Sequence, residues 1–219
     1  MSYELIHGLI LYLGFVAFVV LHEYAHAWTA VRCGDNTPRL QGRLTLDPIA
    51  HMDLIGTLIL PLAVTILSAQ GGGWMMLGWG RPVQVNLNNF RVRRRDDILV
   101  SVAGPVMNIL TAIVVLIIMK IVQLTAGVST SQLSTPLDLV RLSLFLCFFN
   151  LLPIPPLDGG HIARNFIGMS DETYAKMSQY SFIFLILIIQ VPFIGAFVSS
   201  ITGSALALLV MPFGWRLGG

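Results

Sequence analysis

Long apolar runs separated by short polar stretches predict membrane-spanning helices. A spanning α-helix needs about 20 mostly apolar residues. Three runs meet this length: Leu5–Val31, Ile98–Leu124 and Phe193–Phe213. A fourth run, Leu137–Leu152, meets it if its helix begins near residues 133–136. A fifth run, Tyr180–Val191, meets it only if residues 174–179 are included. We therefore expect an all-α polytopic membrane protein with five to six transmembrane helices. The chain forms a single domain over residues 1–219, with a core at 5–167 and accessory helices within 174–213.

A further apolar run, Leu54–Ala69, has a composition that fits two structures. It contains Pro61 and is followed by three glycines and a second apolar patch, Trp74–Trp79. The segment either crosses the membrane or dips in and returns as a re-entrant hairpin over residues 54–79, packed against protein.

The polar segment Arg32–Asp53 is rich in turn-forming residues. Within it, residues 39–46 alternate between polar and apolar side chains, and Pro82–Asn86 shows the same alternation. Alternation with a period of two is typical of short strands. We therefore expect a small membrane-associated β element next to the helices.

Composition agrees with a protein that uses lipid as its solvent. Of 219 residues, 55% are hydrophobic and 11% are charged, whereas soluble domains carry about 25% charged residues. The net charge is +2, and no basic array interleaved with aromatic residues is present, which argues against a nucleic-acid partner. Cys33 and Cys147 lie far apart in the sequence and are interpreted as reduced residues. The N-terminus lacks the features of a cleaved signal peptide, so the first run is expected to remain as a helix.

The sequence His22-Glu23-Tyr24-Ala25-His26 is an H-E-x-x-H motif inside the first apolar run. A spacing of four residues places both imidazoles on one helix face, where they can bind one Zn²⁺. Glu23 lies beside them and can take a proton from the metal-bound water. Such a pentapeptide also arises by chance, but ionisable groups within a membrane helix are costly and mark function.

A catalytic zinc needs a third protein ligand and one open position. His7 lies about 22 Å away along the helix and cannot reach. His51 and His161 remain candidates, and Asp158 is the best one. It follows Asn150-Leu-Leu-Pro-Ile-Pro-Pro-Leu157, in which prolines break the fourth apolar helix; a broken helix at membrane depth is tolerated where it lines a cavity. The alternative is that Asp158 only caps the next helix.

These motifs together resemble the site-2 protease family of intramembrane zinc metalloproteases. The matching stretches are His22–His26, Ala103–Asn108 and Asn150–Gly159, within a resemblance that covers about Leu11 to Ile167. The resemblance implies that His22, His26 and Asp158 bind zinc and that Glu23 is the general base. It also suggests that Asn150 holds the substrate backbone or stabilises the oxyanion. The match is to the small bacterial and archaeal form without PDZ or CBS domains, so regulation would be absent or come from another protein.

Two lesser features have structural explanations. The stretch Gly104–Asn108 is typical of small-residue helix contacts in membranes, with Asn108 as an interhelical hydrogen-bonding residue. The run Arg91–Asp97 is interpreted as a solvated, positively charged anchor for the next helix.

The proposed ligands constrain how the chain crosses the membrane. His22, His26 and Asp158 can share one ion only if the first and fourth helices run parallel, which requires that residues 54–79 re-enter rather than cross. The hairpin also puts eight of the thirteen Lys and Arg residues, all within Arg32–Asp97, on one side. By the positive-inside rule that side is cytoplasmic. We therefore expect five crossings, an external N-terminus, an internal C-terminus and a zinc site nearer the cytoplasmic face of the plasma membrane.

These features predict a zinc metalloendopeptidase with one zinc per chain. Its substrate is expected to be a membrane protein cut in or near a transmembrane segment. Two alternatives share the same residues: a membrane zinc hydrolase acting on a lipid or small amphiphile, and a non-catalytic protein that binds or transports zinc. A glutamate next to the ligand pair favours hydrolysis.

Overall fold

The computed structural model describes residues 3–68, 78–180 and 191–215, and every regular element in these ranges is helical. Three helices within them are long and apolar enough to cross a membrane: α1 (Tyr3–Cys33), α5 (Arg93–Ala126), and α10 (Pro192–Val210) with its 3-10 extension η4 (Met211–Phe213). These helices confirm the all-α class and the membrane character. Of the two other expected helices, α6 (Ser134–Asn150) is a shorter helix of 17 residues, and most of Tyr180–Val191 lies outside the described residues.

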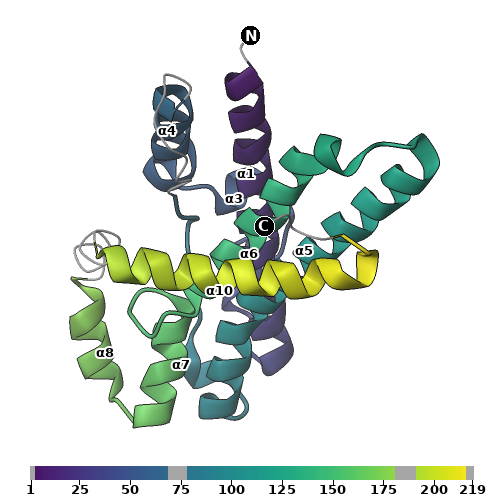
Figure 1. Ribbon diagram of the computed structural model, residues 1–219. Coiled ribbons are helices and arrows are strands. Elements are labelled where there is room, and N and C mark those ends of the chain that lie inside the picture. Colours follow the sequence, from purple (N-terminus) through teal and green to yellow (C-terminus); the bar gives the residue numbers. More distant parts are fainter. Residues whose placement is uncertain (1–2, 69–77, 181–190, 216–219) are drawn as a thin grey trace.

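Helices α1, α5 and α6 pack against one another and form the body of the molecule, and α10 lies across α6 (Figure 1). Leu116, Leu144 and Leu206 are fully or almost fully buried where α5, α6 and α10 meet. Phe15 is buried in a second cluster between α1 and α6. At Gly14 the side chain of Leu139 occupies the space of a Cβ atom. The absence of a side chain at that position therefore allows α1 and α6 to approach closely.

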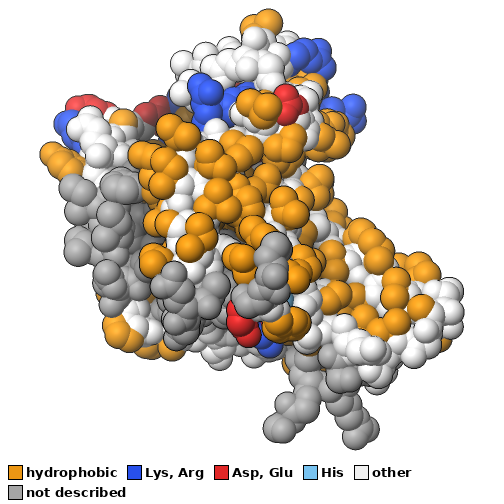
Figure 2. All heavy atoms as spheres, turned by 90° about the horizontal axis from the view of Figure 1, so that it is seen from above, with side chains coloured by type: hydrophobic (Ala, Val, Ile, Leu, Met, Phe, Trp, Pro, Cys, Tyr) orange, Lys and Arg blue, Asp and Glu red, His pale blue; other side chains and the backbone are white. Residues whose placement is uncertain are grey.

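The outer surface of these helices is strongly apolar. Among the described residues, hydrophobic side chains cover much of the face seen in Figure 2, and Lys and Arg side chains cluster mainly at one edge. Along α5, Leu110, Val114 and Ile118 are each about half exposed. Exposed aliphatic side chains repeated every four residues form a stripe suited to lipid.

The apolar run after Asp53 forms a π-helix, η1 (Leu54–Ile59), followed by α4 (Leu60–Ser68), which packs against α1 (Figure 1). The Asp53 carboxylate caps the start of η1 by accepting the N–H groups of Ile55 and Gly56. The Trp79 N–H donates to the Gly56 carbonyl at 3.0 Å. Gly56 and Trp79, which lie near the two ends of the predicted hairpin, are therefore side by side. Most of the connecting residues lie outside the described ranges.

The small β element is not formed in the described part of the chain. Residues 37–40 and 48–51 form short helices, α2 (Thr37–Leu40) and α3 (Pro48–His51), and residues 78–86 form no regular element. The N–H groups of Arg81 and Val83 donate to the His51 carbonyl and the Glu23 carboxylate rather than to a strand. The strand predicted at 82–86 is therefore not confirmed, because strand pairing depends on a partner that alternation does not specify.

The start of α5 differs from the predicted solvated anchor. The 3-10 turn η2 (Leu87–Asn89) leads into it, and Arg93, Arg94 and Arg95 are exposed. Asp96 and Asp97, in contrast, are almost fully buried. Asp96 accepts the Val92 N–H at 2.8 Å and so caps the helix. The acidic pair is therefore structural, and only the arginines form a charged surface.

The chain between α6 and α7 (Asp158–Ile167) is a compact proline-rich turn. The 3-10 turn η3 (Thr130–Leu133) precedes α6, and α8 (Asp171–Ser178) follows α7. A Cβ atom at Gly159 would collide with the Leu151 and Leu152 carbonyl groups, and one at Gly160 would lie 2.8 Å from backbone atoms of Ile154 and Pro155. The two glycines therefore let α7 begin against the end of α6, and this contact fixes the position of Asp158.

A candidate metal centre between α1 and α7

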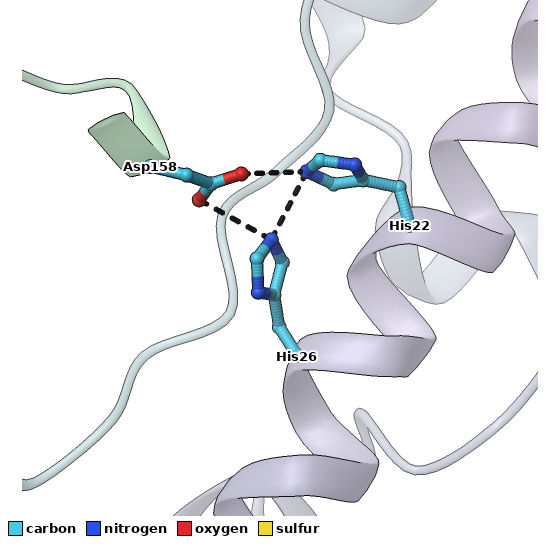
Figure 3. A group of neighbouring side chains, drawn as sticks. All are labelled: His22, His26 and Asp158. Atoms are coloured by element: carbon cyan, nitrogen blue, oxygen red, sulfur yellow. Dashed lines mark hydrogen bonds and ion pairs between the residues drawn. The ribbon is translucent and has the colours of Figure 1, made fainter. Parts of the chain in front are cut away.

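His22 and His26 lie one turn apart on α1 and point in the same direction, as the spacing predicts (Figure 3). Both are buried, with 7% and 8% of their surface exposed. Their Nε2 atoms are 3.0 Å apart and their rings are nearly perpendicular, at 81°. The two imidazoles therefore offer two nitrogen atoms to one point in space.

Asp158, at the first turn of α7, faces this pair from the opposite side (Figure 3). Its Oδ2 lies 3.3 Å from His22 Nε2 and its Oδ1 lies 3.3 Å from His26 Nε2. Ligand atoms around a tetrahedral zinc with bonds of about 2.0–2.1 Å are about 3.3 Å apart. The three side chains thus have the separation that one zinc ion requires.

The hydrogen-bond partners of His26 and Asp158 also suit a cation. His26 Nδ1 lies 2.7 Å from the Val100 carbonyl oxygen, so it must carry a hydrogen, and in neutral His26 the lone pair is on Nε2. Asp158 Oδ2 is buried, faces His22 Nε2 at 3.3 Å and accepts no hydrogen bond from the described residues. Two imidazole nitrogens and a carboxylate that converge without enough donors between them are a donor set for a divalent metal, and zinc accepts this combination.

Helix α5 supplies a platform beneath the two imidazoles. Val100, Gly104 and Asn108 follow one another at intervals of four residues and share one helix face. The Val100 carbonyl accepts from His26, and Asn108 Nδ2 lies 3.2 Å from His22 Nδ1. At Gly104, a Cβ atom would contact both imidazole rings. Hydrogen-bonding groups thus flank a gap in which only glycine fits.

The side chains of His22, His26 and Asp158 line a cavity of about 410 Å³. Glu23 and Asn150 also line it, together with the start of α7 and several residues of the segment before η2, namely Gly78, Trp79, Gly80, Pro82, Val83 and Val85. Glu23 Oε2 accepts the Val83 N–H at 3.0 Å, and Asn150 donates its amide to the Leu146 carbonyl at 2.9 Å. A carboxylate and an amide are therefore placed in the same cavity as the metal-binding side chains.

Comparison with known proteins identifies the family of the chain. The family model of Peptidase family M50 matches residues 10–138 and 118–190. The chain belongs to Peptidase family M50, the site-2 protease family. It is therefore a zinc metalloprotease by family.

Curated relatives have matching names. The chain is 36% identical over 186 residues to "Putative zinc metalloprotease YwhC" of Bacillus subtilis, covering 81% of this chain and 78% of the relative. It is 31% identical to "Putative zinc metalloprotease Rip2" of Mycobacterium tuberculosis, over 82% of this chain and 66% of that protein. Rip2 of Mycolicibacterium smegmatis is 28% identical over the same shares of the two chains. No solved structure matches the chain.

The other two histidines weighed as ligands are not part of the cluster in this M50 chain. His51 is fully buried, and its Nε2 lies 2.8 Å from the Thr45 carbonyl oxygen. It therefore stabilises the loop before α3. His161 lines the cavity one turn after Asp158, and its Nδ1 lies 3.5 Å from Asp97 Oδ1. His161 thus faces Asp97 and belongs to the wall of the cavity.

Sequence reasoning missed the role of Asp97, which joins α5 to α7. Its carboxylate accepts hydrogen bonds from Arg164 and Asn165. Arg164 also stacks on the ring of Tyr174 in α8, at 4.9 Å from the centroid. An acidic residue beside three arginines appears solvated in the sequence, and only the fold shows that it anchors the helix carrying Asp158.

Proposed function

We propose that this M50 protein is an intramembrane metalloprotease of the H-E-x-x-H type that hydrolyses peptide bonds in or near transmembrane segments of other membrane proteins. The proposal rests chiefly on the convergence of His22, His26 and Asp158, with ligand atoms 3.0 to 3.3 Å apart, in a cavity that also contains Glu23. One zinc ion per chain would occupy this site. When bound, it would polarise the scissile carbonyl and lower the pKa of a water molecule.

Glu23 is proposed as the general base. Its carboxylate follows His22 directly in the sequence and lies in the cavity wall, where the Val83 N–H holds one oxygen. It would take a proton from the attacking water and deliver it to the leaving amine, as carboxylates do in acid–base catalysis. The second oxygen, Oε1, is the atom assigned to that proton transfer.

Asn150 is proposed to hold the substrate backbone or to stabilise the negative charge that develops on the carbonyl oxygen. It lies at the last turn of α6, immediately before the proline break, and its side chain lines the cavity. Its amide is anchored to the Leu146 carbonyl, which leaves the side-chain oxygen and the second amide hydrogen for other partners. A preorganised amide donor lowers the energy of an oxyanion transition state.

The proposed membrane arrangement has five crossings, an external N-terminus, an internal C-terminus and residues 54–79 as a re-entrant hairpin. The contact between Gly56 and Trp79 supports the hairpin, because the two flanks of this stretch lie side by side. The excess of arginine within residues 32–97 supports a cytoplasmic position for that side. The protein would then lie in the plasma membrane with its site nearer the cytoplasmic face. Cysteines introduced at Arg43 and Gly72 should react with an impermeant reagent from the same side; labelling from opposite sides would contradict the hairpin.

The function is tested with purified protein in liposomes, loaded with zinc and given a fluorogenic peptide that contains one transmembrane segment. The wild type should cleave the peptide, and cleavage should stop with a zinc chelator. Glu23→Gln should lower turnover by about 10²–10⁴-fold and keep its zinc. Unchanged turnover in Glu23→Gln would refute the assigned base. Lipid hydrolysis without peptide cleavage would refute the substrate class.

A further inference from the structure

The buried side-chain amide of Asn108 contacts His22 at one end and, within the described part of the chain, lacks a hydrogen-bond partner at the other. Asn108 is fully buried in α5, and its Nδ2 atom lies 3.2 Å from His22 Nδ1 on α1. The other end of the same amide, Oδ1, is buried and has no hydrogen-bond partner among the described residues. A buried amide oxygen without a donor costs about 1–3 kcal/mol.

The ring hydrogen of a metal-binding His22 can supply a donor for the Asn108 oxygen. His22 directs Nε2 toward His26 and Asp158, so binding a metal ion there leaves Nδ1 with the ring hydrogen. That hydrogen needs an acceptor, and an amide nitrogen does not accept. A half-turn of the Asn108 amide about its last bond exchanges the two ends. It puts Oδ1 opposite His22 Nδ1–H and gives the buried oxygen its donor.

We propose that Asn108 is a positioning residue for the metal centre, whose side-chain oxygen accepts the Nδ1–H of His22 and holds Nε2 toward the ion. The inference rests on the proposed function, since it takes His22 as a zinc ligand. Such outer partners fix the tautomer and orientation of a ligating histidine, and their loss costs about 10–100-fold in metal affinity.

The two histidines are held in different ways. His26 Nδ1 is bonded to a backbone carbonyl, that of Val100, which no substitution removes. His22 depends on a side chain, so the metal affinity can be altered at Asn108. The Asn108 backbone is fixed separately, because Ser143 of α6 donates its hydroxyl hydrogen to the Asn108 carbonyl at 2.8 Å.

The contact between Ser143 and the Asn108 carbonyl allows variants to distinguish positioning of His22 from helix packing. If Asn108 serves only as an interhelical contact, its link to α6 runs through its backbone and survives a change of side chain. Ser143→Ala removes that link and leaves the amide in place. Asn108→Leu keeps the volume approximately and removes the acceptor. Asn108→Asp keeps an acceptor oxygen and, as a carboxylate, makes a stronger hydrogen bond to His22.

The test measures zinc dissociation constants by chelator competition on full-length protein in detergent, together with the melting temperature of each metal-free variant. Asn108→Leu should bind zinc about 10–100-fold more weakly. Asn108→Asp should bind zinc at least as tightly as the wild type. Ser143→Ala should lower the melting temperature with little change in the zinc dissociation constant. Wild-type affinity in Asn108→Leu, or the same loss in Asn108→Asp as in Asn108→Leu, would overturn the proposal.

His22→Ala distinguishes failure of this inference from failure of the proposed function. If the wild type binds zinc and His22→Ala does not, the ligand set stands and the Asn108 variants decide the inference alone. If His22→Ala binds zinc as the wild type does, or the wild type binds none, both the ligand set and the role of Asn108 are refuted.

Discussion

Val83 donates its backbone N–H to Oε2 of Glu23 at 3.0 Å, across 60 positions of sequence. The segment that carries Val83 forms part of the wall of the cavity, and the N–H of Arg81, two residues before it, donates to the His51 carbonyl. The carboxylate proposed as general base is therefore held by a segment that is itself anchored to the last residue of α3. Placement of Glu23 depends on this segment as well as on the motif.

Replacing Val83 by proline removes the N–H that Glu23 accepts. A hydrogen bond to a charged group contributes about 1.5–3 kcal/mol, so we expect turnover to fall about 10–100-fold with unchanged zinc content. The measurement is cleavage of the liposome substrate beside metal analysis. Gln84→Pro is the matched control, because its N–H makes no hydrogen bond within the described ranges. Equal loss in both variants would show that proline itself disturbs the segment.

Replacing Gly104 by alanine should disrupt the metal centre. The new methyl group would occupy space held by both imidazole rings, and overpacking a well-packed site costs about 1–3 kcal/mol. We expect zinc affinity to fall by about tenfold or more. Gly203→Ala on α10 is the control, since a Cβ atom there meets nothing within 4 Å. Both changes place alanine in a helix. Equal zinc affinity in the two variants would therefore contradict the claim that Gly104 leaves the space that the two imidazole rings need.

Asp35 makes the stability of the loop after α1 depend on pH. Burial alone would raise its pKa, but hydrogen bonds from Thr37, Asn89 and Asn86 hold the pKa below its usual range. A lowered folded-state pKa adds stability above the unfolded pKa of about 3.9, and this stability is lost as pH falls through the folded value. We expect Asp35→Asn to melt at a lower temperature than the wild type at pH 7. The difference between the two should shrink below about pH 4; a constant difference would show that the carboxylate charge is unimportant.

The spacing of the ligands could be predicted from the sequence because it is local. An interval of four residues fixes the direction of His22 and His26 on any helix. The prolines and glycines around Asp158 indicated a broken helix with close backbone contact, and Gly159 and Gly160 confirm it. The apolar runs likewise predicted α1, α5 and α10, because hydrophobic length is sufficient to identify a spanning helix.

The supporting contacts could not be predicted, because each joins residues far apart in the chain. Asp97 meets Arg164, and Val83 meets Glu23, at separations of 67 and 60 positions. The sequence around Asp97 indicates a charged surface, and the alternation around Val83 indicates a strand. Neither pattern contains the identity of the partner, so the buried ion pair and the support of Glu23 appear only once the helices are assembled.

Measuring the zinc content of purified wild type and Asp158→Ala decides whether His22, His26 and Asp158 form one site. Asp138→Ala is the matched control, because Asp138 of α6 also pairs with a histidine, His7, at 3.2 Å but lies outside the proposed site. We expect one zinc per chain in the wild type and in Asp138→Ala, and a large loss of zinc in Asp158→Ala after dialysis against a weak chelator. Full zinc content in Asp158→Ala would contradict the shared site and the protease function built on it.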